Sequence, residues 1–336
     1  MSIVRGAPEV FVAAASGPDM TAFGYRDSAR IVGSGAGLTW DAASGAALGE
    51  CLERYCAAML DPGELVYGSF EELRARGNDA CDPEAFALFD PSQEVPYPSF
   101  TRKTRIAWSR GWWLANGAPA FVPGCFAYLS TDSSLREFGS ALIGPAISTG
   151  CACARNMEEA LLYGLYELIE RDAFMIAWRN CLSLPEVIID PASDLSAVFI
   201  SRFSRPGLEF RIWQTTLDLG IPSFLGMLTD RRGTTSRMIV GGAANHDPER
   251  AVLKTLCELT QGLSWLDSGE FNEEDANIKI DDIHTFTDRA RFYASVLREN
   301  AFSFLRQGSD VRPLSSISSL KASVFPKGFL CSWQIS

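Results

Sequence analysis

Three segments of the 336-residue chain repeat one pattern of acidic residues. They read TWDAASGAALGECLER at 39–54, NMEEALLYGLYELIER at 156–171 and DPERAVLKTLCELTQG at 247–262. Aligned without gaps, they share the pattern [TND]-x-[DE]-x-A-x-x-x-x-L-x-E-x-x-[EQ]. Carboxylate oxygens are the ligands that hard cations such as Mg²⁺ prefer, so the repeated acids predict a site for such a cation.

The end of the pattern places two oxygen-bearing side chains on one face of each helix, because residues three apart are neighbours there. The pairs are Glu50 with Glu53, Glu167 with Glu170, and Glu258 with Gln261. If the three faces converge, the five glutamates form an oxygen-rich cage for Mg²⁺, which normally arrives with phosphate oxygens as co-ligands. Arg54 and Arg171 are placed to neutralise acids or phosphates. The residues therefore predict a Mg²⁺–nucleotide site.

An alternative interpretation treats the same acids as surface residues. Arg54 follows Glu50 by four positions and Arg171 follows Glu167 by four, as in ordinary ion pairs on a solvated helix face. Apolar residues flank the acids closely in LLYGLYELIERDAFMIAW, which favours a position near the core boundary. Three copies in one register also favour a functional site over three unrelated surface pairs.

The elements that carry the acids are predicted to be capped helices. Thr39, Asn156 and Asp247 are good N-caps, since a side-chain oxygen can accept a hydrogen bond from a free backbone N–H group. Each segment follows an apolar strand and a stretch of small residues, in RIVGSGAGL, PAISTGCACAR and SRMIVGGAAN. The repeated unit is therefore predicted to be strand, tight Gly/Ala loop and helix, a setting in which phosphate can approach a helix N-terminus.

Composition limits the function classes. The formal charge of −11 argues against broad contact with nucleic acid, which needs a basic surface. Two histidines exclude a three-histidine zinc site, and the chain has no Walker motif G-x-x-x-x-G-K-[ST]. We find no run of 18 apolar residues and no signal peptide, so no membrane span is expected and a cytoplasmic location is predicted.

The three segments resemble the motifs of the YcaO family, ATP-using enzymes that modify peptide backbones. The matching stretches are GSGAGLTWDAASGAALGECLERYCA, STGCACARNMEEALLYGLYELIERDAF and GGAANHDPERAVLKTLCELTQG. The most similar subgroup is the azoline-forming cyclodehydratases of ribosomal peptides. The resemblance implies binding of ATP and Mg²⁺ by residues at the motif positions. These are Glu50, Glu53, Arg54, Ser148, Glu167, Glu170, Arg171, Glu258 and Gln261, with the metal held by Glu50, Glu53, Glu167, Glu170 and Glu258.

The resemblance also implies a reaction. A Cys, Ser or Thr side chain of a ribosomal precursor peptide attacks the preceding backbone carbonyl, ATP phosphorylates the resulting oxyanion, and loss of phosphate leaves a thiazoline or oxazoline. No enzyme nucleophile is needed, and no catalytic residue is assigned. Two alternatives stay open: a non-catalytic or truncated scaffold that binds nucleotide and a partner, and a thioamidation enzyme that uses external sulfide.

Partners follow from the same resemblance. They are the precursor peptide and a separate leader-peptide-binding protein of the E1-like, ocin-ThiF type. The resemblance also allows a flavin dehydrogenase that acts downstream, and association of two copies of the chain as a homodimer. The sequence departs from the family at two places. Ala36 stands where members often carry Lys, and residues 301–336 lack the usual proline-rich tail, so this part is expected to be incomplete and loosely packed.

The fold is predicted to be α+β, with a mixed or antiparallel sheet and three strand–loop–helix units converging on one ATP cleft. A single domain over residues 1–336 is expected. Strands are predicted at 119–129, 187–190, 209–214, 222–228 and 236–241. The DRRGT sequence at 230–234 predicts the turn of a hairpin between the last two.

Overall fold

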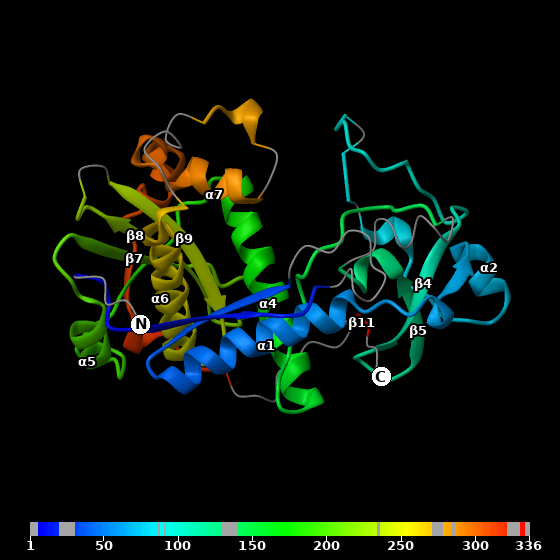
Figure 1. Ribbon diagram of the computed structural model, residues 1–336, viewed down its shortest axis with the longest axis horizontal. Coiled ribbons are helices and arrows are strands. Elements are labelled where there is room, and N and C mark those ends of the chain that lie inside the picture. Colours follow the sequence, from blue (N-terminus) through cyan, green and yellow to red (C-terminus); the bar gives the residue numbers. More distant parts are fainter. Residues whose placement is uncertain are drawn as a thin grey trace. The chain divides into compact units, whose positions relative to one another are not determined.

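A computed structural model describes residues 6–19, 31–86, 88–90, 92–129, 140–233, 236–270, 278–283, 286–320 and 330–332 (Figure 1). The chain folds into two compact units, each assembled from separate stretches of sequence. The first unit comprises Met1–Ala14, Ser34–Leu48 and Ala154–Val324. The second comprises Ala15–Gly33, Gly49–Cys153 and Phe325–Ser336. The single domain expected from the sequence stays a prediction.

A five-stranded mixed sheet forms the centre of the first unit, in the order β10-β6-β7-β8-β9. Its strands are β6 (Glu186–Ile188), β7 (Leu208–Gln214), β8 (Ser223–Asp230), β9 (Arg237–Ala244) and β10 (Val311–Pro313). Neighbouring strands are antiparallel except β10 and β6, which are parallel. The β8–β9 hairpin turns after Asp230, which confirms the predicted turn. The α+β class with a mixed sheet is also confirmed.

The helices of the described residues begin and end as follows. They are α1 (Trp40–Ala58), α2 (Phe70–Ala75), α4 (Met157–Arg179), α5 (Ser196–Val198), α6 (Pro248–Trp265) and α7 (Phe286–Ala294). Within the described parts of the chain, none of these helices combines the length and the apolar composition that crossing a bilayer requires.

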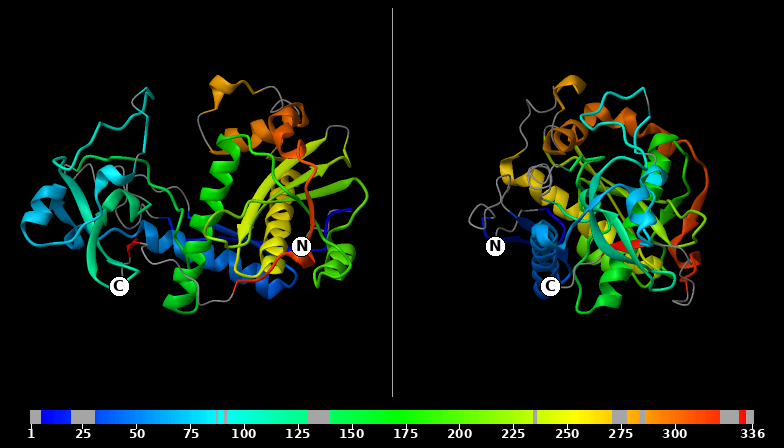
Figure 2. Two further views of the ribbon diagram at one scale, coloured as in Figure 1. Left: turned by 180° about the vertical axis from the view of Figure 1, so that it is seen from behind. Right: turned by 90° about the vertical axis from the view of Figure 1, so that its right-hand side faces the viewer.

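Two helices cover opposite faces of the sheet. Phe224 of β8 packs in one cluster with Val252 and Leu256 of α6. The next residue along β8, Leu225, packs in another cluster with Phe174 and Trp178 of α4. Because successive side chains of a strand point to opposite faces, α6 and α4 lie on the two sides of the sheet; Figure 2 shows both helices with the sheet from two further sides. All eight residues of β8 are buried as a result.

Small residues let the first strands of the chain pack directly on a helix. Strands β1 (Phe11–Ser16) and β2 (Val32–Gly37) form a two-stranded sheet. A Cβ atom at Gly35 would lie 2.6 Å from the Cβ of Ala46 and 2.5 Å from the carbonyl oxygen of Ala43. Ala43 itself is fully buried, which explains the alanine of the repeated pattern. The glycines of VGSGAG therefore lie within a strand, whereas the sequence predicted a loop there.

The second unit holds an antiparallel sheet in the order β11-β4-β3, with β5 also paired to β4. Its strands are β3 (Val66–Gly68), β4 (Ile106–Trp113), β5 (Pro119–Pro123) and β11 (Leu330–Ser332). The predicted strand at 119–129 is real but ends at Pro123, where a short 3₁₀ turn at Gly124–Phe126 follows. Trp108 is fully buried in the core and donates through its ring N–H to the carbonyl of Gly68 at 2.9 Å.

The described part of the C-terminal region is packed rather than loose. Phe302 and Leu305 are almost fully buried in a cluster with Trp213 of β7. Leu314 is 1% exposed and packs with α6 residues and Phe203. Residues 301–320 thus contribute to the core, which corrects the expectation that this region is loosely packed.

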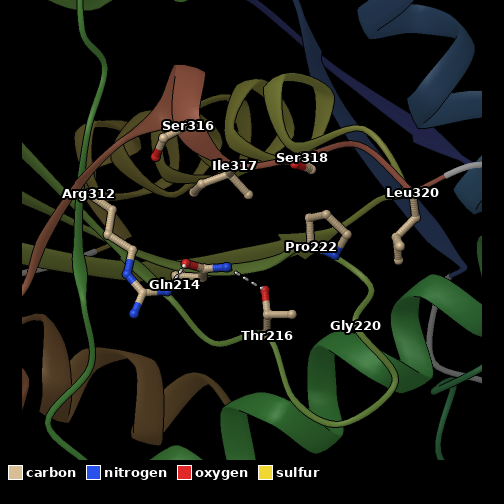
Figure 3. Close-up of a pocket in the computed structure, with 9 residues that line it drawn as sticks. All are labelled: Gln214, Thr216, Gly220, Pro222, Arg312, Ser316, Ile317, Ser318 and Leu320. Atoms are coloured by element: carbon tan, nitrogen blue, oxygen red, sulfur yellow. Dashed lines mark hydrogen bonds between the residues drawn. The ribbon is translucent and has the colours of Figure 1, made fainter.

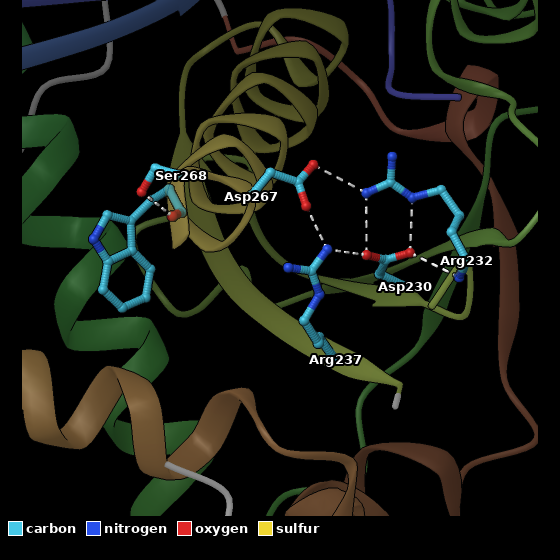
Figure 4. Close-up of polar contacts among 6 residues, drawn as sticks. Asp230, Arg232, Arg237, Asp267 and Ser268 are labelled. Atoms are coloured by element: carbon cyan, nitrogen blue, oxygen red, sulfur yellow. Dashed lines mark hydrogen bonds and ion pairs between the residues drawn. The ribbon is translucent and has the colours of Figure 1, made fainter. Parts of the chain in front are cut away.

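A buried ion cluster ties the β8–β9 hairpin to the end of α6 (Figure 4). Asp230 is 1% exposed and pairs with Arg232 at 2.8 Å and with Arg237 at 2.5 Å. Asp267 pairs with the same two arginines, at 3.2 and 2.5 Å. Two acids and two arginines balance within the cluster, so the buried charge of Asp230 is paired on both sides.

Candidate functional site

The three acid-bearing helices begin at the residues that the repeated pattern predicts. Thr39 accepts a hydrogen bond from the Ala42 N–H at 3.2 Å, and Asn156 accepts one from Glu159 N–H at 2.9 Å. Asp247 accepts one from the Glu249 N–H at 3.0 Å. The predicted N-caps are confirmed. Because the helices begin at equivalent positions, each Glu-x-x-[Glu/Gln] pair lies at the same distance from its helix start.

Glu170 of α4 and Glu258 of α6 meet at β9, the edge strand of the sheet. A Cβ atom placed on Gly241 would lie 3.6 Å from the Cβ of Glu258. One placed on Gly242 would lie 3.8 Å from the Cγ of Glu170. The two glutamates come from helices on opposite faces, and the two glycines leave room for them to approach across the strand. The small residues before α6 therefore make space for carboxylates.

The pKa values of both carboxyl groups are raised. Burial and the neighbouring Glu258 carboxylate raise the pKa of Glu170 from 4.5 to about 8. Burial likewise raises the pKa of Glu258, against the lowering effect of Lys254 and of a backbone hydrogen bond from Gly242. The Glu258 side chain nevertheless keeps 37% of its surface exposed. Surrounding protein removes much of the hydration of the pair, and solvent or a ligand can still reach it.

A lysine that the sequence analysis missed lies beside this pair. Lys254 Nζ is 3.6 Å from Glu258 Oε1, one helical turn before it, and its side chain is 56% exposed. Although burial works against its charge, Glu258 and Glu170 raise the pKa of Lys254. Its position four residues before Glu258 was a usable signal, because residues four apart share a helix face.

Other predicted residues of the first unit form ordinary polar contacts around the pair. Arg171 donates to Glu167 at 2.9 Å, the i,i+4 ion pair of the surface interpretation. Glu167 still contributes to the raised pKa of Glu170, so it lies near the same site. Gln261 donates to the Ser34 hydroxyl at 2.7 Å, which joins α6 to β2. The first unit thus brings together Glu167, Glu170 and Glu258, with Gln261 one turn further along α6.

The remaining predicted residues lie in the second unit. Arg54 donates to Glu50 at 2.6 Å and to the carbonyl of Val32 at 2.8 Å. Glu53 is near Cys153, whose pKa it helps to raise after burial and Cys56. Ser148 begins a turn in which its carbonyl accepts the Cys151 N–H at 2.9 Å and Gly150 takes a positive φ of 89°. The convergence of all three acid pairs on one cleft stays a prediction.

The second strand–loop–helix unit differs from the other two. Strand β2 leads into α1 and β9 leads into α6, as predicted. Among residues 140–156, all of them described, there is a turn and no strand before α4. Arg155, just before that helix, pairs with Glu159 at 2.6 Å and is 87% exposed, so its guanidinium faces solvent.

Glu170 and Glu258 fit a divalent cation. Burial raises the pKa of both carboxyl groups, and Glu258 adds to the rise at Glu170, so a cation placed between them would favour their charged forms. Within the described ranges, three or more His, Cys, Asp or Glu side chains are nowhere gathered as a formed metal site. The pair alone therefore leaves most ligand positions to oxygen atoms from elsewhere, as Mg²⁺ bound to phosphate requires.

A separate hollow of about 330 Å³ lies between the β7–β8 loop and residues 312–320 (Figure 3). Gln214, Thr216 and Arg312 give it polar walls, and Arg312 donates to Gln214 at 3.1 Å. None of the predicted site residues lines this hollow. It is therefore distinct from the acid pair.

The α+β fold and a pair of largely desolvated carboxylates beside β9 are compatible with an enzyme that uses a metal–nucleotide complex. Residues 34–324 match the family model described as YcaO cyclodehydratase, ATP- and Mg²⁺-binding, and the chain belongs to the YcaO family. ATP and Mg²⁺ are the cofactors of that family. The resemblance drawn from the three motifs is thereby confirmed.

Comparison with known proteins supports the same assignment. A Rhizobium leguminosarum bv. trifolii protein of the tfuA 3′ region is 31% identical over 237 residues, which cover 68% of this chain and 53% of the relative. The chain spans a little more than half the length of the curated relatives it matches, at 53% and 58%.

Solved structures show the fold. A heterocyclase in complex with substrate and cofactor matches with a TM-score of 0.71 and 24% identity, covering 87% of this chain and 39% of that one. YcaO from Methanopyrus kandleri, bound with AMPPCP and Mg²⁺, matches with a TM-score of 0.60 and 20% identity, covering 96% and 72%. At these identities the likeness concerns the architecture, and YcaO proteins share it.

Proposed function

We propose that this protein is an ATP-dependent peptide cyclodehydratase. Its substrate would be a ribosomal precursor peptide, and its product a thiazoline or oxazoline formed from a Cys, Ser or Thr residue. Membership of the YcaO family supports the use of ATP. The observation that carries the proposal is the Glu170–Glu258 pair, two largely desolvated carboxyl groups with raised pKa values beside Lys254.

The proposed reaction assigns roles to residues of this chain. When bound, ATP supplies the phosphoryl group that makes the amide oxygen a leaving group, and Mg²⁺ neutralises the charge of the transfer. Glu170 and Glu258 would hold the metal, together with Glu167, Glu50 and Glu53. Lys254, whose side chain is 56% exposed beside Glu258, would also contact the phosphate. Overall, peptide and ATP give azoline, ADP and phosphate.

The peptide provides its own nucleophile, so the enzyme needs no Ser, Cys or His to attack the carbonyl. We propose a separate leader-peptide-binding protein of the E1-like, ocin-ThiF type as the partner that delivers the precursor. A cytoplasmic location follows from a ribosomal substrate and from ATP as the co-substrate. A downstream flavin dehydrogenase would oxidise the azoline, and self-association as a homodimer is proposed on the family resemblance alone.

Calorimetry with ATP tests the nucleotide site. We expect wild-type protein to bind ATP in the presence of Mg²⁺ and to lose at least about 100-fold in affinity when Glu170 becomes Gln, because the metal loses an anionic ligand. Asp172→Asn is the matched control, since Asp172 is exposed on the same helix and the change removes the same charge. Equal affinity of Glu170→Gln and wild type would contradict the assignment of the site.

Mass spectrometry of a precursor peptide, incubated with its leader-binding partner and ATP, tests the reaction. Loss of one water per modified residue, with release of phosphate, is the expected result. Exchange of an amide oxygen for sulfur in the presence of sulfide would instead identify thioamidation. An unmodified peptide despite tight Mg²⁺–ATP binding would favour the non-catalytic scaffold.

A further inference from the structure

His246, in the short link between β9 and α6, connects three segments of the first unit. Its Nδ1 atom is 2.5 Å from the hydroxyl of Tyr166 on α4, and the two rings stack with centroids 6.1 Å apart. Its carbonyl accepts the N–H of Leu320 at 2.9 Å. The next residue, Asp247, caps α6. One residue therefore joins α4, the start of α6 and the C-terminal segment.

The contact with Tyr166 lies one helical turn from the acid pair. Tyr166 and Glu170 are four residues apart on α4, so they are neighbours along one face, separated by about 6 Å of axial rise. His246, just after β9, follows Gly242 by the same number of residues, and Gly242 lies against Glu170. The segment from Gly242 to His246 thus touches α4 at two successive turns. The two contacts link the helix of Glu170 to the segment that leads into α6, the helix of Glu258.

The hydroxyl of Tyr166 is held in apolar surroundings. The residue is 4% exposed and packs with Ile169, Ile221 and Ala244, together with the partly buried Leu320. A buried phenol needs a hydrogen-bond partner, and His246 supplies it: the hydroxyl donates to Nδ1 when the ring carries its proton on Nε2. The bond is directional, and it links α4 to the segment that follows β9.

We propose that His246 is a positioning residue for the Mg²⁺–ATP site, acting through its hydrogen bond to Tyr166. The bond fixes α4, which carries Glu167 and Glu170, against the start of α6, about three turns before Glu258. This inference rests on the proposed nucleotide site. A displacement of about 1 Å between ligand groups is enough to lower the performance of such a site by an order of magnitude or more.

The experiment compares Mg²⁺–ATP affinity, measured by calorimetry, with the melting temperature of the nucleotide-free protein. Tyr166→Phe removes the hydroxyl and keeps the ring, and His246→Phe removes the acceptor and keeps an aromatic ring for stacking. Tyr163→Phe, on the same helix at 48% exposure, is the matched control for loss of a phenol hydroxyl. Ile221→Val loosens the same apolar cluster without touching the bond, and so controls for a merely structural effect.

We expect each of Tyr166→Phe and His246→Phe to weaken Mg²⁺–ATP binding about 10-fold, and the double variant to bind no worse than Tyr166→Phe alone, because loss of the hydroxyl already removes the bond to the imidazole ring. Ile221→Val and Tyr163→Phe should bind as wild type does. Unchanged affinity in Tyr166→Phe and His246→Phe, or an equal loss in Ile221→Val, overturns the positioning role while the nucleotide site stands. Failure of the wild type to bind Mg²⁺–ATP overturns the proposed function and this inference together.

Discussion

Two groups of charged residues lie along the same hairpin and helix, and they differ in how their charges are balanced. At one end of β9, Asp230 and Asp267 face Arg232 and Arg237, with acids and arginines equal in number. Further along β9, Glu170 and Glu258 share Lys254, whose ammonium is 3.6 Å from Glu258 Oε1. Two arginines lower the pKa of Asp230 to about 2 against the effect of its burial, whereas burial and a second acid raise that of Glu170 to about 8.

The difference separates a structural charge cluster from a ligand site. Balanced, buried charges are satisfied within the protein, and they hold the hairpin to α6. At the other site three acids, Glu167, Glu170 and Glu258, face two cations, Lys254 and Arg171, among the groups that shift these pKa values, so an excess negative charge is available to a cation from solution. The sign of a charge beside a helix does not by itself identify its role. The number of acids relative to cations, and the exposure of their side chains, distinguish a structural cluster from a ligand site.

Breaking the balanced cluster is expected to give the largest effect on stability. Asp230→Asn leaves two partly buried arginines with one acid, and should lower the free energy of unfolding by about 3 kcal/mol, measured by urea titration. Asp310→Asn, which breaks the exposed pair with Arg312, should change it by less than about 0.5 kcal/mol. An equal effect of the two substitutions would show that the buried cluster is not a stabilising feature.

Alanine substitution of the two glycines beside the glutamates is expected to lower stability by less, and by different amounts at the two positions. A Cβ at position 242 would lie 2.7 Å from the carbonyl oxygen of Phe224, so Gly242→Ala must shift the backbone, at a cost of about 2 kcal/mol. Gly241→Ala meets its neighbours at 3.6 Å or more and should cost less than about 1 kcal/mol. Thermal unfolding of both variants gives the comparison, and a more severe effect at Gly241 would contradict this packing.

The two regions should also respond to pH in opposite directions. The folded pKa of Asp230 lies below its ordinary value of 3.8, so its stabilisation is present above that pH and is lost as the pH falls toward about 2. The folded pKa of Glu170 lies above its ordinary value of 4.5, so the nucleotide-free protein should lose stability as the pH rises from about 4.5 to about 8. Glu170→Gln should flatten the second slope and leave the first, as followed by melting temperature across that range.

The smallest effect on stability is expected at Lys254. Its side chain is more than half exposed, so Lys254→Met should change the free energy of unfolding by less than about 1 kcal/mol. Without the ammonium, the two glutamates repel each other more strongly, and the pH range in which Glu170 titrates should move upward. Carbon-detected NMR titration of the Glu170 carboxyl measures that shift; a downward shift would contradict the arrangement.

The sequence predicted the local features of this site better than its assembly. Caps at Thr39, Asn156 and Asp247 depend on a few neighbouring residues, and these were found correctly. The meeting of Glu170 with Glu258 depends on α4 and α6 covering opposite faces of one sheet, which no local pattern encodes. The glycines at 241 and 242 predicted a loop, because their role in a strand becomes visible only when the carboxylates on both sides are known.

Lys254 and His246 illustrate two kinds of missed residue. Lys254 had a signal in its spacing from Glu258, but one lysine on a helix is commonly a solvated residue. His246 was interpreted as one of two histidines too few for metal chemistry, and its contact with Tyr166 joins positions 80 residues apart. Such contacts follow from the tertiary structure, so sequence spacing could not reveal them.

The discontinuous make-up of the first unit has a consequence for how the protein is made on the ribosome. Its β2 strand and the first turns of α1 are synthesised early, yet their partners on α6 and the sheet come more than 150 residues later, as the contact of Ser34 with Gln261 illustrates. Until α6 has emerged, the apolar side of the early segment has no permanent cover. Folding of the first unit therefore waits for α6, and the early segment is exposed to aggregation or chaperone capture while the residues up to α6 are being added.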